Sequence, residues 1–398
     1  MKYDFETIVD RTNTGSLKWD QMFQFCPNLP KGIVPFSVAD MEIKNAPEII
    51  EGLKHYLDTA ILGYTGPTDA YFDAVCGWMK KRHNWDIKKE WIVGSPGVVP
   101  GFYLLVRALT KPGDGVIIQP PVYYPFYSAI EANGRTVVKN TLIFKNGRYE
   151  IDYDDLERKA RDKNNKVLLF CSPHNPVGRV WTKEELGKVG DICLRNNVII
   201  ISDEIHNDLI MPGKKHTVFA TLSDELANSM AMCTAPSKTF SLAGLQTSNL
   251  IIPNEAIRNA YLQEAGKNAF MVLNAIGYKA CEIAYTQCEK WLDEVMLLID
   301  HNRRILTDFI EKNIPIIKVI ELEGTYLQWL DFRGLGLGKE ELEKRLHEEA
   351  FLFFDEGYVF GDEGVGFERW NLACPSKTMM EGLERLATFV KKVEKEKR

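Results

Sequence analysis

Residues 167–178 read VLLFCSPHNPVG, residues 198–206 read VIIISDEIH, and residues 230–238 read MAMCTAPSK. Each segment opens with a short, continuous apolar run, which is typical of a strand buried on both faces. The runs VIIQ at 116–119 and NLII at 249–252 have the same character, and helical patterns lie between the runs. One of these, residues 182–196, starts with a capping box formed by Thr182 and Glu185. The alternation predicts an α/β fold with a mainly parallel sheet between helices.

Polar side chains come directly after these runs. Asn175 lies in the first segment, Asp203 and His206 in the second, and Lys238 in the third. Taken singly, they are also compatible with an Asn-Pro turn, a helix cap and a surface lysine. Ligands of such sheets, however, bind at the carboxyl ends of the strands. We therefore expect an amide, a carboxylate, an imidazole and an amine to converge on one edge of the sheet.

Two earlier segments extend this prediction. Residues 94–109, GSPGVVPGFYLLVRAL, are typical of a glycine-containing loop that opens a helix, where free backbone N–H groups suit a phosphate. A plain loop–helix junction would have the same pattern. Residues 120–127, PPVYYPFY, place Tyr123 after the strand-like run VIIQ, where its ring could stack on a flat heteroaromatic group or simply pack in the core.

The C-terminal hundred residues have a different pattern. Helical stretches at 291–312 and 339–349 flank strand-like pieces at 325–330 and 369–372, which indicates a smaller α+β domain. We expect a large domain over residues 46–290 and a small domain made of residues 1–45 and 291–398.

Bulk properties exclude several classes of function. The 49 basic and 55 acidic side chains give a formal charge of -6, which argues against nucleic acid or an anionic membrane as the main partner. No run is long enough to span a membrane, and the N-terminus has no apolar signal-peptide core. The eight cysteines form no C-x-x-C pair, so we expect reduced, buried thiols, no metal site and a cytoplasmic location.

The motifs together resemble a known family. FSVADMEI (36–43), SPHNPVGRVW (172–181), SDEIHNDL (202–209), APSKTFSLAGLQ (235–246) and FERWNLACP (367–375) resemble the fold-type I pyridoxal 5′-phosphate (PLP) enzymes of aminotransferase class I/II. Within them, the chain looks most like the bacterial cystathionine β-lyase, or cysteine C–S lyase, branch. The resemblance implies an aspartate-aminotransferase-like fold with a seven-stranded sheet, PLP as cofactor, a small amino-acid substrate and a homodimer with active sites at its interface.

The resemblance also implies a role for each site residue. Lys238 would bond covalently to PLP, Asp203 would pair with the ring nitrogen, and Tyr123 would stack on the ring. Other cofactor contacts would come from Asn175, His206, Ser237, the backbone of Gly97, Val98 and Val99, and Tyr64 of the partner subunit. Arg369 would bind the substrate carboxylate through a bidentate pair, beside Asn175 and Ala39.

The favoured hypothesis for activity is α,β-elimination of cystathionine or a cysteine S-conjugate to pyruvate, ammonia and a thiol. The alternative is an aminotransferase, since the same lysine, aspartate and arginine would serve both reactions. Gln246 stands where many aminotransferases have a phosphate-binding arginine, and this favours the lyase. Ser37 and Val38 stand where that branch usually has Trp-Val. The side chain that the substrate pocket prefers therefore stays undetermined. The complete set of site residues argues against a non-enzymatic descendant of the fold, and no residue indicates a second role in binding a transcription regulator.

Overall fold

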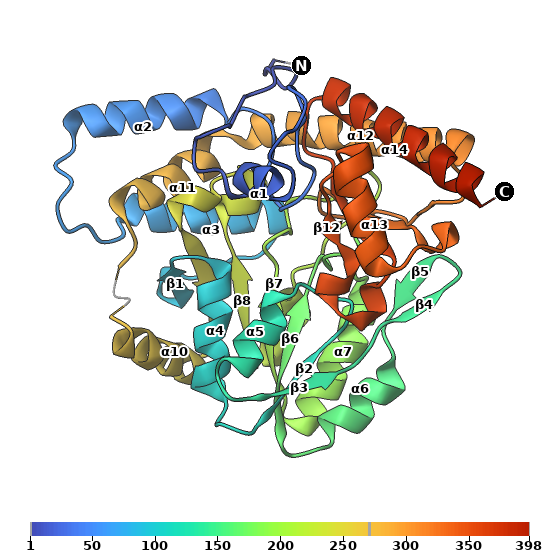
Figure 1. The fold of residues 1–398 in the computed structure, drawn as a ribbon. Coiled ribbons are helices and arrows are strands. Elements are labelled where there is room, and N and C mark those ends of the chain that lie inside the picture. Colours follow the sequence, from blue (N-terminus) through green and yellow to red (C-terminus); the bar gives the residue numbers. More distant parts are fainter. Residues whose placement is uncertain (1, 270–271, 398) are drawn as a thin grey trace.

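The fold is built on a seven-stranded sheet, seen in a computed structural model that describes residues 2–269 and 272–397 (Figure 1). Its strand order is β1-β9-β8-β7-β6-β2-β3. The central strands run parallel, and β9 is antiparallel to both of its neighbours. The strand bounds in chain order are β1 (Ile92–Ser95), β2 (Gly115–Ile118), β3 (Thr136–Lys139), β6 (Asn165–Cys171), β7 (Ile199–Asp203), β8 (Met230–Thr234) and β9 (Ser248–Ile251).

Helices cover both faces of this sheet because alternate strand residues point to opposite sides. Leu169 packs in the core on one face, under α4 (Val98–Leu109), α5 (Pro125–Glu131) and α10 (Glu255–Lys267). Leu168 packs in the core on the other face. The helices of that face are α3 (Asp69–His83), α6 (Tyr153–Ala160), α7 (Lys183–Asn196) and α11 (Ala275–Gln287). The continuous apolar runs of the sequence therefore reflect a sheet that is buried on both faces.

The sequence located five of the seven strands, and helix α7, within one or two residues. Strand β8 has the predicted bounds, and α7 begins after Thr182 with the predicted capping box. Strands β1 and β3 were not predicted. Each has four residues, and their mixed burial gives no continuous apolar run. The antiparallel direction of β9 was not predicted either, because a short apolar run contains no information on direction.

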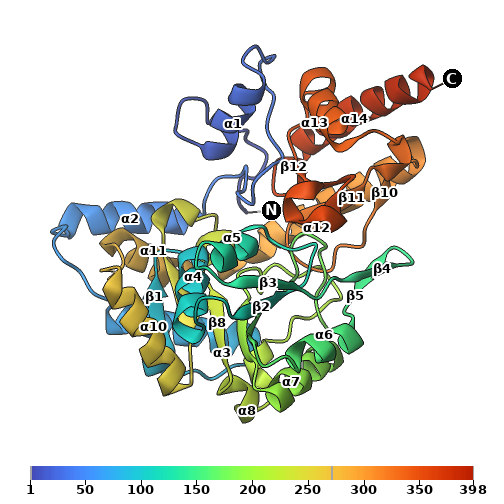
Figure 2. The same cartoon turned by 60° about the horizontal axis from the view of Figure 1, so that its bottom comes forward.

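A second, four-stranded antiparallel sheet lies next to the first, in the order β10-β11-β13-β12. It packs with the long helices α12 (Glu289–Asn313) and α14 (Ser376–Glu396), and α13 (Lys339–Arg345) lies beside it (Figure 2). The predicted boundary after residue 290 falls inside α12, which continues unbroken from one region to the other. The division into domains stays a prediction. The strand bounds are β10 (Lys318–Val319), β11 (Leu327–Asp331), β12 (Asp355–Glu356) and β13 (Phe367–Asn371).

The N-terminal segment packs against the second sheet. Phe36 donates its backbone N–H to Phe353 and accepts one from Asn371. Helix α1 (Leu17–Phe25) contributes Trp19 and Met22 to a small core with Phe353. The remaining elements are α2 (Pro47–Thr59), the short helices α8 (Asp224–Ala227) and α9 (Pro236–Thr239), and the hairpin of β4 (Ile143–Lys145) with β5 (Arg148–Glu150).

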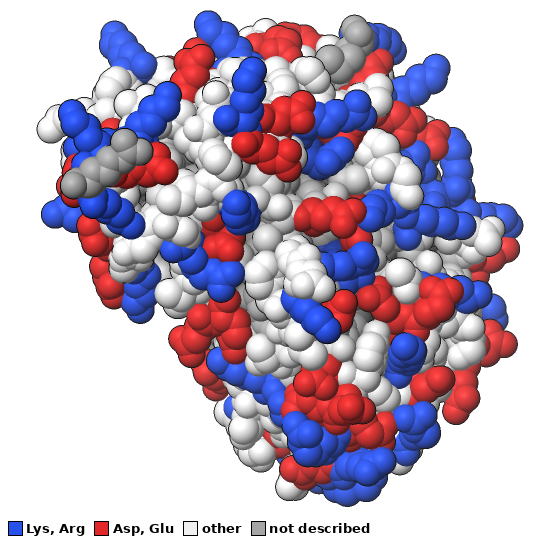
Figure 3. Space-filling view, turned by 90° about the vertical axis from the view of Figure 1, so that its right-hand side faces the viewer, with Lys and Arg blue, Asp and Glu red and all other residues white. Residues whose placement is uncertain are grey.

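Charged side chains of both signs are mixed on the surface. On the face drawn in Figure 3, basic and acidic side chains are interspersed. None of the helices formed by residues 2–269 and 272–397 combines the length and the apolar character needed to cross a bilayer.

Candidate active site

One cavity lies at the carboxyl ends of the central strands, between the two sheets. All the predicted site residues except Tyr64 line it: Ala39, Gly97, Val98, Val99, Tyr123, Asn175, Asp203, His206, Ser237, Lys238 and Arg369. The structure therefore brings these side chains together at one edge of the sheet. Their chemical roles remain predictions.

Lys238 places a buried amine in this cavity. It lies on α9, directly after β8, and its Nζ donates a 2.8 Å hydrogen bond to the carbonyl oxygen of Ala39. Burial lowers the pKa of Lys238 from 10.5 to about 8, and the positive charge of Arg369 adds to this effect, against the opposing charges of Asp40 and Asp203. Near neutral pH, a measurable fraction of this amine is neutral and can act as nucleophile or base.

Asp203 places a buried carboxyl in the same cavity. It ends β7 and is 3% exposed, and its Oδ1 accepts a hydrogen bond from the backbone N–H of Ile205 at 3.2 Å. Burial raises its pKa from 3.8 to about 7, although the Ile205 N–H and the charge of Lys238 oppose the shift. No ion pair joins it to any Lys, Arg or His of the described residues. A cationic atom of a ligand would supply the missing partner.

Asn175 and His206 lie at the same edge of the large sheet as Asp203 and Lys238. The Oδ1 of Asn175 accepts a 2.8 Å hydrogen bond from Nη1 of Arg369. His206 is buried, its Nδ1 has no hydrogen-bond partner among the described residues, and its ring meets that of Tyr326 edge-on. Burial, together with the charges of Lys238 and Arg369, lowers the pKa of His206 well below 6.5, so the imidazole is neutral at pH 7. A buried polar atom without a partner is typical of a site that binds a ligand.

Arg369 has an acidic partner that the sequence did not reveal. Asp355 Oδ2 accepts hydrogen bonds from Nη2 at 2.6 Å and from Nε at 3.2 Å. The two residues are directly opposite each other in the pair of strands β12 and β13. Asp355 also accepts the backbone N–H of Val38 at 2.8 Å. The segment DEGYVF that contains Asp355 has no recognisable motif, so only the strand pairing could have identified this residue.

The backbone of Val38 is bent into the left-handed region at the cavity wall. Its φ is +55°, which is unusual for a β-branched residue and costs on the order of 1–3 kcal/mol. Two hydrogen bonds hold it there: its N–H to Asp355 and its carbonyl oxygen to Asn371 Nδ2, 2.8 Å each. This bend directs the next carbonyl, that of Ala39, toward Lys238.

The start of α4 forms another part of the cavity wall. Gly97 caps the helix with φ +155°, a conformation that other residues rarely adopt, and an added Cβ would lie 3.2 Å from Pro100 Cδ. The N–H groups of Val98 and Val99 precede the first intrahelical bonds and are free for an anion. Ser237 and Gln246 line the same cavity. This arrangement suits a phosphate group.

Tyr64 lies outside the cavity of its own chain. Its side chain is fully exposed, in the loop between α2 and α3, next to the exposed residues Ile61 and Leu62. Within a single chain it is not among the residues that line the cavity.

Comparison with known proteins agrees with this geometry. Residues 31–386 match the family described as aminotransferase class I and II. The chain is 42% identical to the cystathionine beta-lyase PatB of Bacillus subtilis over 96% of this chain and 98% of that protein. It superposes on cystalysin from Treponema denticola, a structure that contains pyridoxal 5′-phosphate, with a TM-score of 0.97 and 53% identity, covering 98% and 100% of the two chains. A PLP-bound C–S lyase from Staphylococcus hominis gives a TM-score of 0.90 and 32% identity, covering 98% of each chain.

The match to the family extends over most of the sequence, and the relatives are covered almost from end to end. The chain is therefore a member of the aminotransferase class I and II family.

Proposed function

We propose that the chain is a PLP-dependent C–S β-lyase, which cleaves cystathionine or a cysteine S-conjugate to pyruvate, ammonia and a thiol. The observation that carries PLP-dependent chemistry on an amino acid is the convergence of Lys238, Asp203 and Arg369 on one cavity. The names of PatB and of the S. hominis C–S lyase, two relatives that align over nearly their full length, support this reaction type.

The residues of the cavity fit PLP. The buried carboxyl of Asp203 lacks a cationic partner among the described side chains and would pair with the protonated ring nitrogen. The free N–H groups at the start of α4 would bind the phosphate, and Lys238 would hold the aldehyde carbon. Asn175 and the neutral His206 would face the ring oxygen, and Tyr123 would lie against the ring. When bound, PLP supplies an electron sink that stabilises negative charge at the substrate Cα.

The protein supplies orientation and proton transfer. Arg369 would bind the substrate carboxylate, while Asp355 and Asn175 hold the plane of its guanidinium. The neutral amine of Lys238 would remove the Cα proton and hold it at Nζ. The Cβ–S bond then breaks, and the thiolate takes a proton from Lys238 or from Tyr123. Burial raises the pKa of Tyr123 and lowers that of Lys238 to about 8, so the protonated Lys238 is the stronger acid of the two. Water converts the released three-carbon enamine to pyruvate and ammonia.

An aminotransferase is the second candidate, because the family includes that activity by name and the same three side chains would serve it. The two reactions differ in where the proton on Lys238 goes after it leaves Cα. In a lyase the proton would leave with the thiol, whereas in an aminotransferase Lys238 would pass it on to the cofactor.

The deciding experiment mixes the PLP-loaded protein with L-cystathionine in the absence of any 2-oxo acid and follows pyruvate and ammonia. A lyase gives many turnovers with equal amounts of the two products. One equivalent of oxo acid per chain, with the cofactor left as pyridoxamine phosphate, would contradict the lyase and identify an aminotransferase. Lys238→Ala is the control, and it should retain PLP but lose steady turnover.

We further propose that the active form is a homodimer in the cytoplasm, with Tyr64 binding the phosphate in the partner's site. The exposed Tyr64, Ile61 and Leu62 support a subunit contact at this loop, since exposed apolar clusters mark interfaces. All eight cysteines are free, which suits a reducing compartment.

Complementation tests the dimer. Tyr64→Ala and Lys238→Ala would each be nearly inactive alone. If Tyr64 acts across the interface, mixing them forms hybrid dimers with one intact site and restores up to about a quarter of wild-type activity under random exchange. No recovery, with exchange of subunits shown by mass, would place Tyr64 in its own chain's site.

A further inference from the structure

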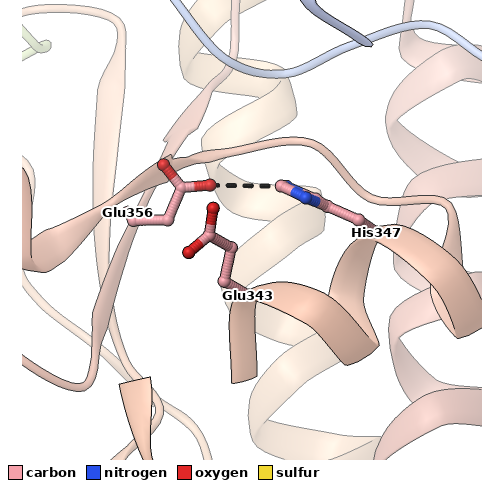
Figure 4. Close-up of side chains that lie close together, drawn as sticks. All are labelled: Glu343, His347 and Glu356. Carbon is pink, nitrogen blue, oxygen red and sulfur yellow. Dashed lines mark ion pairs between the residues drawn. The ribbon is translucent and has the colours of Figure 1, made fainter. Parts of the chain in front are cut away.

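A second cluster of ionisable side chains lies in the region of the smaller sheet, away from the cavity described above. Glu343 is on α13, His347 is on the π-helical turn Leu346–Ala350 that continues it, and Glu356 is on β12. One ligand atom from each lies within 4.8 Å of the other two. Figure 4 shows the three side chains pointing toward one another, with His347 Nε2 and Glu356 Oε1 3.3 Å apart.

A fourth carboxyl group points into this cluster from β13. Strands β12 and β13 pair Asp355 with Arg369 and, one residue on, Glu356 with Glu368. Because side chains alternate along a strand, the first pair faces the cavity and the second pair points to the opposite face. Glu368 is 3% exposed, and its Oε2 is buried without a hydrogen-bond partner among the described residues.

A bound cation would offset the repulsion between these carboxylates. Like charges directly opposite each other in a strand pair are destabilising. Among the ion pairs of residues 2–269 and 272–397, none joins Glu343, Glu356 or Glu368 to a lysine or an arginine. Within the same residues, the basic group in contact with the cluster is the imidazole of His347.

Neighbouring groups hold the cluster in position. The ring of His347 lies between those of Phe25 and Phe353, with centroid distances of 4.7 and 4.9 Å. The hydroxyl of Tyr358 donates a 2.9 Å hydrogen bond to Glu343 Oε2. Orientation of ligands by surrounding contacts of this kind is characteristic of metal sites.

We propose that Glu343, His347 and Glu356 bind a divalent transition-metal ion, for which Zn²⁺ is the best fit, with the carboxyl of Glu368 beside it. One imidazole and two carboxylates suit Zn²⁺ better than Mg²⁺ or Ca²⁺, which prefer oxygen ligands alone. The 3.3 Å separation of the imidazole nitrogen and the carboxylate oxygen matches the edge of a tetrahedron with bonds of about 2.0 Å.

The ion would connect α13 to β12 on the face opposite the Asp355–Arg369 pair. Its role is therefore to hold β12 in place, and it takes no part in the proposed reaction. The sequence indicated no metal because Glu343 and His347 are separated from Glu356 by a turn, and only the fold brings them together.

The test uses the full-length, PLP-loaded protein, freed of metal with a chelator and dialysed against Zn²⁺. Elemental analysis should find about one zinc per chain in the wild type. Glu343→Gln and His347→Gln should lower the zinc affinity, measured against a chromogenic chelator, by at least about tenfold. Glu348→Gln changes an exposed carboxyl on the same helical turn and should bind zinc as the wild type does. Equal zinc binding by His347→Gln and the wild type, or no zinc in either, would overturn the proposal.

One further variant, Cys26→Ser, tests whether zinc binds at these carboxylates or at a nearby thiol. Cys26 Sγ lies 3.5 Å from the carbonyl oxygen of His347, so a thiolate could bind zinc in this region. Cys26→Ser should retain the zinc. If Cys26→Ser loses zinc while Glu343→Gln keeps it, the carboxylate site is refuted.

Thermal unfolding gives an independent measurement on another variant, Glu356→Gln. Zinc should raise the Tm of the wild type by a few degrees and leave that of Glu356→Gln unchanged. Without zinc, the Tm of Glu356→Gln should equal or exceed that of the wild type, because one of the opposed charges is gone. A zinc-dependent rise in Tm for Glu356→Gln equal to that of the wild type would count against the site.

Discussion

Lys238 should destabilise the folded protein when PLP is removed, and replacing it with methionine should stabilise that apoprotein. Its pKa falls from 10.5 to about 8 in the folded chain, chiefly because of burial. A shift of this size corresponds to about 3 kcal/mol at 1.36 kcal/mol per pKa unit. Loss of the hydrogen bond from Nζ to the Ala39 carbonyl oxygen offsets about 1 kcal/mol. We therefore expect Lys238→Met to raise the free energy of unfolding by about 2 kcal/mol at pH 7.

The effect has a definite dependence on pH. The unfolded chain binds the Lys238 proton more tightly than the folded chain, since the pKa in the folded state is the lower one. The destabilisation is therefore complete below about pH 8 and disappears as the pH rises through 10.5. The gain from Lys238→Met should shrink by most of its value between pH 7 and pH 10.

Urea unfolding of the two apoproteins, at equal concentration and at both pH values, measures this difference. Lys111→Met, which removes an exposed lysine, is the control and should change the stability by less than about 0.5 kcal/mol. Two results would show that burial does not lower the pKa of this amine. One is a Lys238→Met apoprotein no more stable than the wild type at pH 7, and the other is a gain in stability that does not change with pH. The rate of PLP reconstitution of the wild type should rise with pH and level off above about pH 8, where the amine is neutral.

Three other variants test separate parts of the structure. Asp203→Asn removes the carboxyl proposed to keep the cofactor ring protonated. If the pKa of the ring nitrogen falls by about two units, kcat for pyruvate formation should fall by at least about 100-fold, while absorbance shows PLP still bound. A fall of less than threefold would contradict that role. Arg369→Lys loses the planar fork for a carboxylate, and we expect KM to rise by about tenfold or more with a smaller change in kcat; an unchanged KM would place the substrate carboxylate elsewhere. Glu323→Gln breaks a buried ion pair with Arg179 at 2.8 Å and weakens the contacts with Arg148 and Lys214. The free energy of unfolding in urea should therefore fall by about 3 kcal/mol. A fall below about 1 kcal/mol would show that solvent compensates the unpaired charge of Arg179.

Local sequence patterns were sufficient to predict the elements that depend on near neighbours in the chain. Continuous apolar runs identify strands buried on both faces, and the residues directly after each run lie at the carboxyl edge of the sheet. That reasoning brought Asn175, Asp203 and Lys238 together without any knowledge of contacts between them. The capping box at Thr182 and the helix start at Gly97 were equally accessible, because each depends on residues a few positions apart.

Only the tertiary fold shows which distant residues pair with each other. Asp355 acts on Arg369 because β12 and β13 pair in one register, and a shift of a single residue would have put Glu356 opposite it. The same register places Glu356 and Glu368 on the far face with His347, 21 residues before Glu368 in the chain. The bend at Val38 depends on partners more than three hundred residues away, Asp355 and Asn371. Such pairings result from the packing of whole sheets and helices, whose geometry no short stretch of sequence contains.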